Sequence, residues 1–114
     1  MESGGAEEAV AFDVGGEVVR GNLMLPDAHG DTGVLFLHGY SGVRGGPHNL
    51  LTAMARGLAA AGVASLRFDF RGRGESGGGP DAAALVTMAE DALEAEAVLR
   101  ERADVHSISN GKGY

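Results

Sequence analysis

The residues best suited to chemistry follow a short apolar run at residues 34–37, where His38, Gly39 and Tyr40 open a glycine-rich loop. Enzymes that transfer acyl groups need backbone N–H groups aimed at the oxygen that gains negative charge in the transition state. A loop that follows a strand can present such groups, and the N–H of Tyr40 would be one donor here. The plainer alternative is a strand end with a glycine turn and no ligand. This segment alone favours neither.

A second segment, residues 67–77, changes that balance because it reads R-F-D-F-R-G-R-G-E-S-G. It stands together with the H-G-Y-S-G loop at residues 38–42 and with P-H-N-L at residues 47–50. In this combination the chain resembles the α/β-hydrolase superfamily. The nearest likeness is to the group of cinnamoyl and feruloyl esterases and monoacylglycerol-lipase-like proteins. The resemblance is close over residues 33–77 and looser elsewhere.

The resemblance implies roles for individual residues. Gly39 and Tyr40 correspond to the oxyanion loop of the family. Ser76 lies in a turn with no nucleophile elbow around it, so it is not expected to be a nucleophile. That turn follows the fourth strand of the family, has a structural role there, and corresponds to Asp69, Arg71, Gly72, Gly74 and Ser76. The implied reaction is hydrolysis of a small-molecule acyl ester through a serine acyl-enzyme, with no cofactor and no metal.

The nucleophile that this reaction needs is missing from the sequence. The family carries a Ser in G-x-S-x-G, then an acid and a His in that chain order, and no G-x-S-x-G occurs here. The elbow should follow the second helix, but residues 107–112 are too polar for a central buried strand. Ser109 has a glycine two residues after it, Gly111, but position 107, where the motif needs its first glycine, is a serine. Gly113 and Tyr114 could instead be the first two residues of an elbow. We therefore expect a fold truncated before the nucleophile elbow.

Three explanations for the missing nucleophile stay open: a fragment, a shifted or prematurely stopped reading frame, and a half that a second polypeptide completes. Whether the chain acts as an enzyme is open for the same reason. The alternative function is a catalytically inactive fragment or pseudo-hydrolase that binds a partner through its open sheet edge.

Nucleotide binding is a third hypothesis, because residues 72–77 satisfy G-x-G-x-x-G after a strand. A dinucleotide site needs a helix that opens at the last glycine, with an acid at the end of the next strand. Here Gly78, Gly79 and Pro80 prolong the loop instead. This hypothesis is therefore the weakest of the three.

The elements that must position these residues begin with a hairpin. Residues 9–14 and 17–25 are β-prone, and Gly15-Gly16 supplies the positive φ angles of a tight turn between them. Residues 34–37 are continuously apolar, which is typical of a strand buried on both faces of a parallel sheet.

The rest of the chain predicts two helices with a strand between them. Pro47 favours the first position of a helix that Gly62 ends as a C-cap, and residues 63–70 predict the next strand. Thr87 and Glu90 fit a capping box at the start of a second helix. The apolar stripe of that helix comprises Met88, Ala92, Ala95 and Leu99.

The predicted fold class is α/β: a partial α/β-hydrolase fold with an N-terminal hairpin, a parallel βαβ unit and a further helix. We divide the chain into a flexible acidic N-terminus (1–8), the N-terminal portion of a hydrolase domain (9–104) and an atypical polar tail (105–114). Without a fifth strand, the apolar edge of strand 34–37 would be open. An open edge invites self-association or pairing with a second polypeptide.

Composition excludes several other classes. The 114 residues carry a net charge of −7, which makes nucleic acid an unfavourable partner. No apolar run approaches the roughly 20 residues that span a bilayer. There is no cysteine, and the four histidines lack ligand spacing, so neither a disulfide nor a metal site is expected. The acidic first residues differ from a signal peptide, and we expect a cytoplasmic protein.

Overall fold

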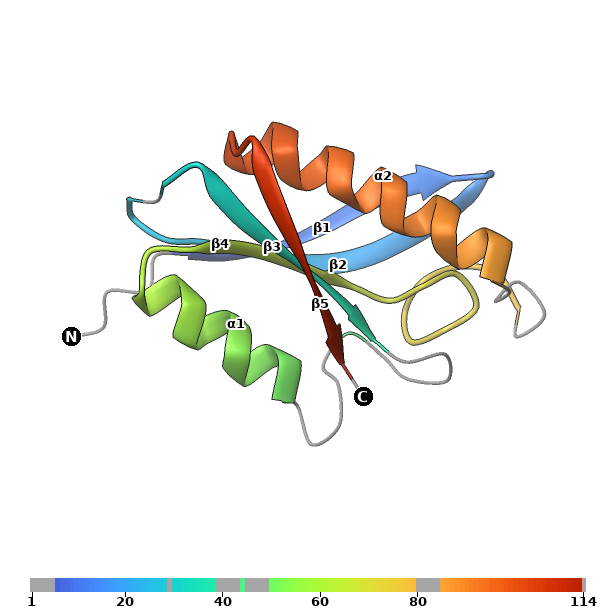
Figure 1. Cartoon of the computed structure of the whole chain (residues 1–114). Coiled ribbons are helices and arrows are strands. Elements are labelled where there is room, and N and C mark those ends of the chain that lie inside the picture. Colours follow the sequence, from blue (N-terminus) through green and yellow to red (C-terminus); the bar gives the residue numbers. More distant parts are fainter. Residues whose placement is uncertain (1–5, 29, 39–43, 45–49, 80–84, 114) are drawn as a thin grey trace.

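The computed structural model of the chain describes residues 6–28, 30–38, 44, 50–79 and 85–113. Within them the chain forms a five-stranded mixed sheet, in the order β1-β2-β4-β3-β5, with one helix on each face (Figure 1). The elements are β1 (Ala6–Val14), β2 (Glu17–Leu25), β3 (Thr32–His38), α1 (Leu50–Ala60), β4 (Ala64–Phe68), α2 (Leu85–Ala103) and β5 (Ser107–Gly113).

The N-terminal hairpin is confirmed. β1 and β2 pair antiparallel from Ala6↔Leu25 to Val14↔Glu17. The two turn residues, Gly15 and Gly16, have φ angles of 59° and 85°, the left-handed values that a two-residue hairpin turn of this kind requires. β1 begins at Ala6, earlier than the apolar pattern predicted, because backbone pairing continues through Glu7 and Glu8.

The parallel unit is also confirmed. β3 and β4 pair in parallel, and the connection between them contains α1. α1 ends at Ala60, and the glycine predicted to cap it, Gly62, follows with a φ of 86°. The Val63 N–H donates to the Leu58 carbonyl (2.8 Å) and the Gly62 N–H to the Ala59 carbonyl (3.0 Å), which is a Schellman cap. Pro47, the predicted first residue of this helix, lies outside the described residues.

The capping box predicted at Thr87 is wrong. α2 already begins at Leu85, so Thr87 and Glu90 lie inside the helix. Both residues also accept from a distant side chain: Arg71 Nη2 donates to the Thr87 backbone carbonyl (3.3 Å) and to the Glu90 carboxylate (2.7 Å). The predicted apolar stripe of α2 is confirmed, since Ala95 and Leu99 are buried in the core and Met88 and Ala92 pack against it.

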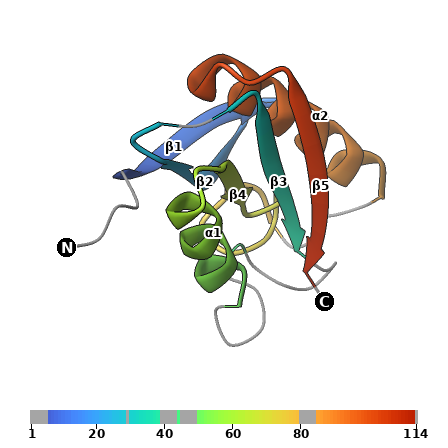
Figure 2. The same ribbon diagram turned by 60° about the vertical axis from the view of Figure 1, so that its left-hand side comes forward.

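β5 corrects the prediction made for the polar tail. Residues 107–113 form a strand that pairs in parallel with β3 from Thr32↔Ser107 to His38↔Gly113, and Figure 2 shows the two strands side by side. β3 is therefore paired on both edges, and the open β3 edge expected from the sequence does not occur. The polarity argument failed because the bonds of a strand ladder use backbone groups, which are the same whatever the side chains are.

The two faces of the sheet are filled differently. On the α2 face, buried side chains from β1, β2, β3, β4 and α2 form a continuous apolar core, and the partly buried Ile108 of β5 packs against it. On the α1 face, the apolar cluster is small and consists of Phe36, Leu51 and Ala55, with Val34 and Leu58 against it. Beside that cluster lies the buried Arg67, whose Nη2 donates to Glu7 (2.7 Å). The α1 face thus combines a small apolar cluster with a buried charged side chain.

One close approach joins the hairpin to the rest of the sheet. β2 pairs antiparallel with β4 from Gly21↔Phe68 to Met24↔Ser65. A Cβ atom at Gly21 would lie 2.5 Å from the Arg67 carbonyl oxygen and 2.9 Å from the Phe68 Cβ.

Among the described residues, no helix has both the length and the apolar character needed to cross a membrane.

Candidate functional site

The candidate site lies at the carboxyl ends of the parallel strands. β3 and β4 run in the same direction, so the loops that follow His38 and Phe68 leave the sheet at one edge. β5 ends at the same edge, because Gly113 pairs with His38. β4 and β5 are the two neighbours of β3, one on each side, so the chain changes direction across the sheet at β3. Ligands of open α/β sheets bind at such switch points, outside the carboxyl ends of the strands.

The end of β3 is fixed by His38. Its side chain is buried, and its Nε2 accepts a hydrogen bond from the Phe70 N–H (3.1 Å). The imidazole also stands edge-on to the Phe70 ring, with 4.8 Å between the ring centroids. Because Nε2 is the acceptor, this bond requires the tautomer with its proton on Nδ1. His38 is therefore held by the segment that follows β4.

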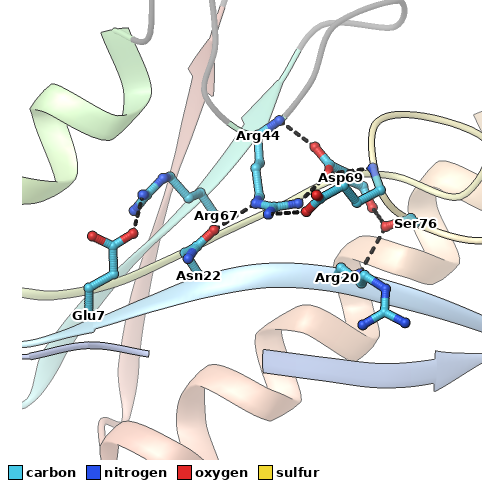
Figure 3. Close-up of polar contacts among 8 residues, drawn as sticks. Glu7, Arg20, Asn22, Arg44, Arg67, Asp69 and Ser76 are labelled. Atoms are coloured by element: carbon cyan, nitrogen blue, oxygen red, sulfur yellow. Dashed lines mark hydrogen bonds and ion pairs between the residues drawn. The ribbon is translucent and has the colours of Figure 1, made fainter. Parts of the chain in front are cut away.

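Arg44 is fixed by the same segment, through Asp69 (Figure 3). Its backbone N–H donates to Asp69 Oδ1 (2.6 Å), and its Nη1 donates to Asp69 Oδ2. The Asp69 carboxylate is almost fully buried and also accepts the Glu75 N–H (3.0 Å). Three donors thus satisfy this buried charge, which would otherwise carry a large desolvation cost.

The rest of the Arg44 guanidinium reaches two other parts of the chain. Nε donates to Asn22 Oδ1 on β2 (2.6 Å), and Nη2 donates to Glu75 (2.6 Å). Burial lowers the pKa of Arg44, but the bond to Glu75 and the charge of Asp69 outweigh it, so the pKa lies above its ordinary value. The bond from Arg44 lowers the pKa of Glu75. Arg44 therefore stays charged and joins three elements at one point.

The glycine-rich loop after β4 is closed upon itself. Its amide groups donate to acceptors within the chain: Gly72 to Gly77, Arg73 to Phe70, Glu75 to Asp69, Ser76 to Arg73, and Gly77 to Val18. A phosphate-binding loop needs such amides free to face the ligand. Moreover, α2 begins at Leu85, eight residues after the last glycine of the pattern. Both observations argue against the nucleotide-binding hypothesis.

Ser76 has the structural role that the resemblance implied. Its hydroxyl donates to the Asp69 carbonyl and accepts the Arg20 N–H (2.9 Å). Gly74, with φ at 50°, brings its Cα against Asp69 so closely that a Cβ would lie 2.4 Å from the carboxylate carbon. Ser76 and Gly74 thus help to set the position of Asp69.

A second buried arginine ties this loop to α2. The Arg71 N–H and Nε donate to the two oxygens of Asp91 (2.8 and 2.6 Å). Burial lowers the pKa of Arg71, but its bonds to Glu90 and Asp91 prevail and raise the pKa above the ordinary value. Asp91 is fully buried, so this pair lies in the interior of the molecule.

The two residues predicted for the oxyanion loop, Gly39 and Tyr40, lie outside the described residues. The structure does place the residues on either side, His38 and Arg44, and brings both to the segment after β4. Sequence reasoning missed Arg44 as a member of the site. The available signal was the excess of arginine over acid in residues 41–73, where Asp69 is the single carboxylate. Within the described part of the chain, no three His, Asp or Glu side chains are grouped to hold a metal ion.

Comparisons with known proteins bear on the fold. No family model matches the chain, and no curated protein matches it in sequence. Among solved structures, the α/β-hydrolase GrgF from Penicillium sp. sh18 is similar over 94% of this chain, with a TM-score of 0.80 and 22% identity. Est1E from Butyrivibrio proteoclasticus, solved with ferulic acid bound, is similar over 91%, with a TM-score of 0.75 and 24% identity. The esterase Pf2001 of Pyrococcus furiosus is similar over 94% of this chain, with a TM-score of 0.73 and 25% identity.

The chain has the fold of the N-terminal part of an α/β-hydrolase. The resemblance and the fold class derived from the sequence are thereby confirmed. This α/β-hydrolase portion covers 37% of GrgF, 42% of Est1E and 42% of Pf2001. It thus spans about two fifths of the length of these solved proteins.

Proposed function

We propose that the chain forms the N-terminal part of a serine hydrolase that cleaves carboxylic esters or similar acyl bonds. In this proposal Gly39 and Tyr40 belong to the oxyanion loop, and the Tyr40 N–H donates to the oxyanion. The α/β-hydrolase fold supports the reaction class, and the neighbours named as esterases support the bond type. The cytoplasmic location stays a prediction.

The observation that carries the proposal is the pairing of β5 with β3. His38, which precedes the proposed oxyanion loop, pairs with Gly113 at the end of β5. A nucleophile elbow is a sharp turn between a strand and a helix, and it needs an oxyanion loop beside it. Gly113 and Tyr114 can be the first two residues of such an elbow. A serine that followed Tyr114 would then leave the sheet beside the end of β3.

The mechanism follows from these positions. The serine attacks the ester carbonyl while a histidine accepts its proton and an acid orients that histidine. The carbonyl oxygen becomes negative, and the Tyr40 N–H stabilises it. Loss of a single donor of this kind lowers kcat by about 10²–10³ in a serine protease. The nucleophile, the acid and the histidine of this proposal lie on further residues of the polypeptide or on a second one.

The test uses the native protein, isolated from its source with an antibody against α1. Its intact mass is measured, it is treated with a fluorophosphonate probe that labels activated serines, and its hydrolysis of p-nitrophenyl butyrate is followed. The coding DNA is read past Tyr114 in three frames. We expect a labelled serine in G-x-S-x-G, on the same polypeptide or one that co-purifies, together with ester turnover. A protein of 114 residues with neither a labelled serine nor turnover would overturn the proposal.

The alternative is a non-enzyme that binds a partner through its sheet edge. The observation in its favour is that, over the described residues, β5 pairs on one side only, with β3. A partner strand would add to the free side of β5, as an extended peptide adds to an exposed edge. This alternative gains if the native protein elutes in a complex that has no esterase activity. It is excluded if the purified chain is monomeric at all concentrations and co-purifies with no other polypeptide.

A further inference from the structure

Arg67 on β4 is a buried cation with few partners. The residue is 3% exposed, and over the described part of the chain only Nη2 of its guanidinium has an acceptor, the Glu7 carboxylate (2.7 Å). Its Nε and Nη1 are buried without a hydrogen-bond partner there, as is the hydroxyl of Ser65, which lies on the same face of β4. A buried charge is costly unless it is paired and hydrogen-bonded. Arg67 therefore needs an anion beside it to remain inside the fold.

Glu7 supplies that anion from β1 (Figure 3). Its Oε2 accepts from Arg67 Nη2, and its Oε1 lies 3.8 Å from Nη2 of Arg56 on α1. Each carboxylate oxygen thus faces one guanidinium, the first from the sheet and the second from the helix. Guanidinium groups match carboxylates both in charge and in geometry. The two arginines therefore form a position that fits a carboxylate.

The end of β1 that carries Glu7 is held loosely. β1 is an outermost strand over the described residues, and Ala6–Ala9 are all exposed, so that Val10 is the first buried residue of the strand. Glu8 points to the opposite face, where it forms an exposed ion pair with Arg102 (2.9 Å). Such pairs add little stability, and segments with few buried contacts open at a low free-energy cost. Residues 6–9 thus form a strap that can leave the sheet while the core stays folded.

We propose that Arg67 and Arg56 form a binding site for a small carboxylate anion, and that Glu7 fills this site as an internal ligand. The site is closed while the strap is in place. When the strap leaves, the guanidinium that Glu7 releases needs another acceptor, and an external monocarboxylate supplies it. Glu7 is thus an autoinhibitory contact. The inference is independent of the proposed hydrolase function, because it involves neither the oxyanion loop nor the elbow.

The test removes the internal ligand and supplies the same chemical group in solution. Glu7→Ala deletes Cγ, Cδ and both carboxylate oxygens, which are the heavy atoms of acetate. The thermal midpoint Tm of the purified chain is measured by circular dichroism at pH 7, in sodium acetate and in sodium chloride of equal concentration. We expect Glu7→Ala to have a lower Tm than wild type and to recover more of the loss in acetate than in chloride. Acetate at ten times its Kd should raise this Tm by about 6 °C.

Glu8→Ala is the matched control, because it removes the neighbouring acid of the same strap from the opposite face of the sheet. Its Tm should be the same in acetate and in chloride, and so should that of wild type, whose site is already filled. In the double variant Glu7→Ala with Arg67→Met, an apolar side chain of similar length replaces the binding group. We expect the preference for acetate to disappear there as well.

Two results would overturn the proposal. One is an equal Tm of Glu7→Ala in the two salts, and the other is a gain in acetate of the same size in Glu8→Ala or in the double variant. If Glu7→Ala does not fold, Glu7→Gln gives the decision, because it keeps an oxygen acceptor for Arg67 but removes the charge that competes with acetate. A higher Tm of Glu7→Gln in acetate than in chloride supports the site, and an equal Tm excludes it.

Discussion

Two arginines make the same unusual pair of bonds in this molecule. Arg44 and Arg71 each present a backbone N–H and a guanidinium N–H to the two oxygens of one buried aspartate, Asp69 and Asp91 respectively. The surroundings differ. Asp91 belongs to α2, and the Arg71 side chain is only 8% exposed, whereas the Arg44 side chain is 22% exposed and stands in the loop after β3. One pair joins a loop to the core, and the other joins a loop to a loop.

The comparison shows that losing the same kind of guanidinium bond should cost different amounts of stability at Asp69 and at Asp91. Asp69 has a third donor, the Glu75 N–H, and so keeps two backbone partners without any guanidinium. Asp91, over the described residues, would keep only the Arg71 N–H. Loss of the guanidinium thus leaves Asp91 with fewer partners in a drier place, where a lone charge costs most.

The largest effect is therefore expected at Arg71. Arg71→Gln should lower the free energy of unfolding by about 3–5 kcal/mol, since it breaks a buried ion pair by removing one partner. Arg44→Gln should lower it by about 1.5–3 kcal/mol, the range for hydrogen bonds to charged groups. Urea unfolding followed by circular dichroism measures both. An Arg44 variant that is as unstable as the Arg71 variant would contradict the comparison.

Substitutions of three glycines with positive φ angles test how firmly these buried pairs are held. Gly74→Ala should lower the free energy of unfolding by about 2–4 kcal/mol, because it adds left-handed backbone strain and displaces the Asp69 carboxylate. Gly15→Ala should also cost more than strain alone, since its Cβ would lie 2.5 Å from Arg71 Nη1, and Asp91 and Glu90 hold that guanidinium in place. Gly16→Ala is the matched control: φ is also positive, but nothing lies within 4 Å, so strain alone should cost about 1–2 kcal/mol. A Gly74→Ala loss equal to that of Gly16→Ala would show that Asp69 is free to move, and a Gly15→Ala loss equal to it would show the same of the Arg71 guanidinium.

The smallest effect is expected from an acid–base pair on the surface. His106 Nδ1 pairs with the Asp31 carboxylate where the chain enters β5, and both side chains are exposed. The bond to Asp31 raises the pKa of His106, and the bond to His106 lowers the pKa of Asp31. The stabilisation is fully present between the unfolded-state values of about 3.9 and about 6.5. It is lost as the pH rises through the raised pKa of His106 or falls through the lowered pKa of Asp31.

The measurement is the unfolding midpoint of wild type and His106→Gln at pH 5.5 and pH 9. The variant should have the lower midpoint at pH 5.5, and the two proteins should converge at pH 9. A difference that is equal at both pH values would show that the imidazole stabilises the strand by packing rather than by charge.

Local signals predicted the fold well where the cause is local. Gly15 and Gly16 mark the hairpin because only glycine adopts their φ angles cheaply, and Gly62 marks the end of α1 for the same reason. The stripe of α2 follows from helical spacing. The capping box failed because α2 already begins at Leu85, and the Glu90 carboxylate binds Arg71, which lies 19 residues earlier. No local pattern records such a partner.

The site was harder to predict for the same reason. Arg44 and Asp69 are 25 residues apart, and Arg44 and Asn22 are 22 apart, so their contacts depend on the sheet order. The motif around Ser76 predicted a structural role, and the bonds of its hydroxyl to the Asp69 carbonyl and the Arg20 N–H agree with it. β5 was missed because its polar side chains say nothing about backbone pairing. The predicted loop residues Gly39 and Tyr40 remain predictions.

The close contact at Gly21 has a consequence for how this chain can vary. Any side chain there would press on the backbone of β4 and separate the hairpin from the parallel strands. A saturation library at position 21, selected for folded protein, should therefore return glycine almost alone. Positions 57 and 79, where a methyl group would meet nothing within 4 Å, should accept many residues. Among the sequences that share this fold, the join between β2 and β4 would then be one of the slowest positions to change.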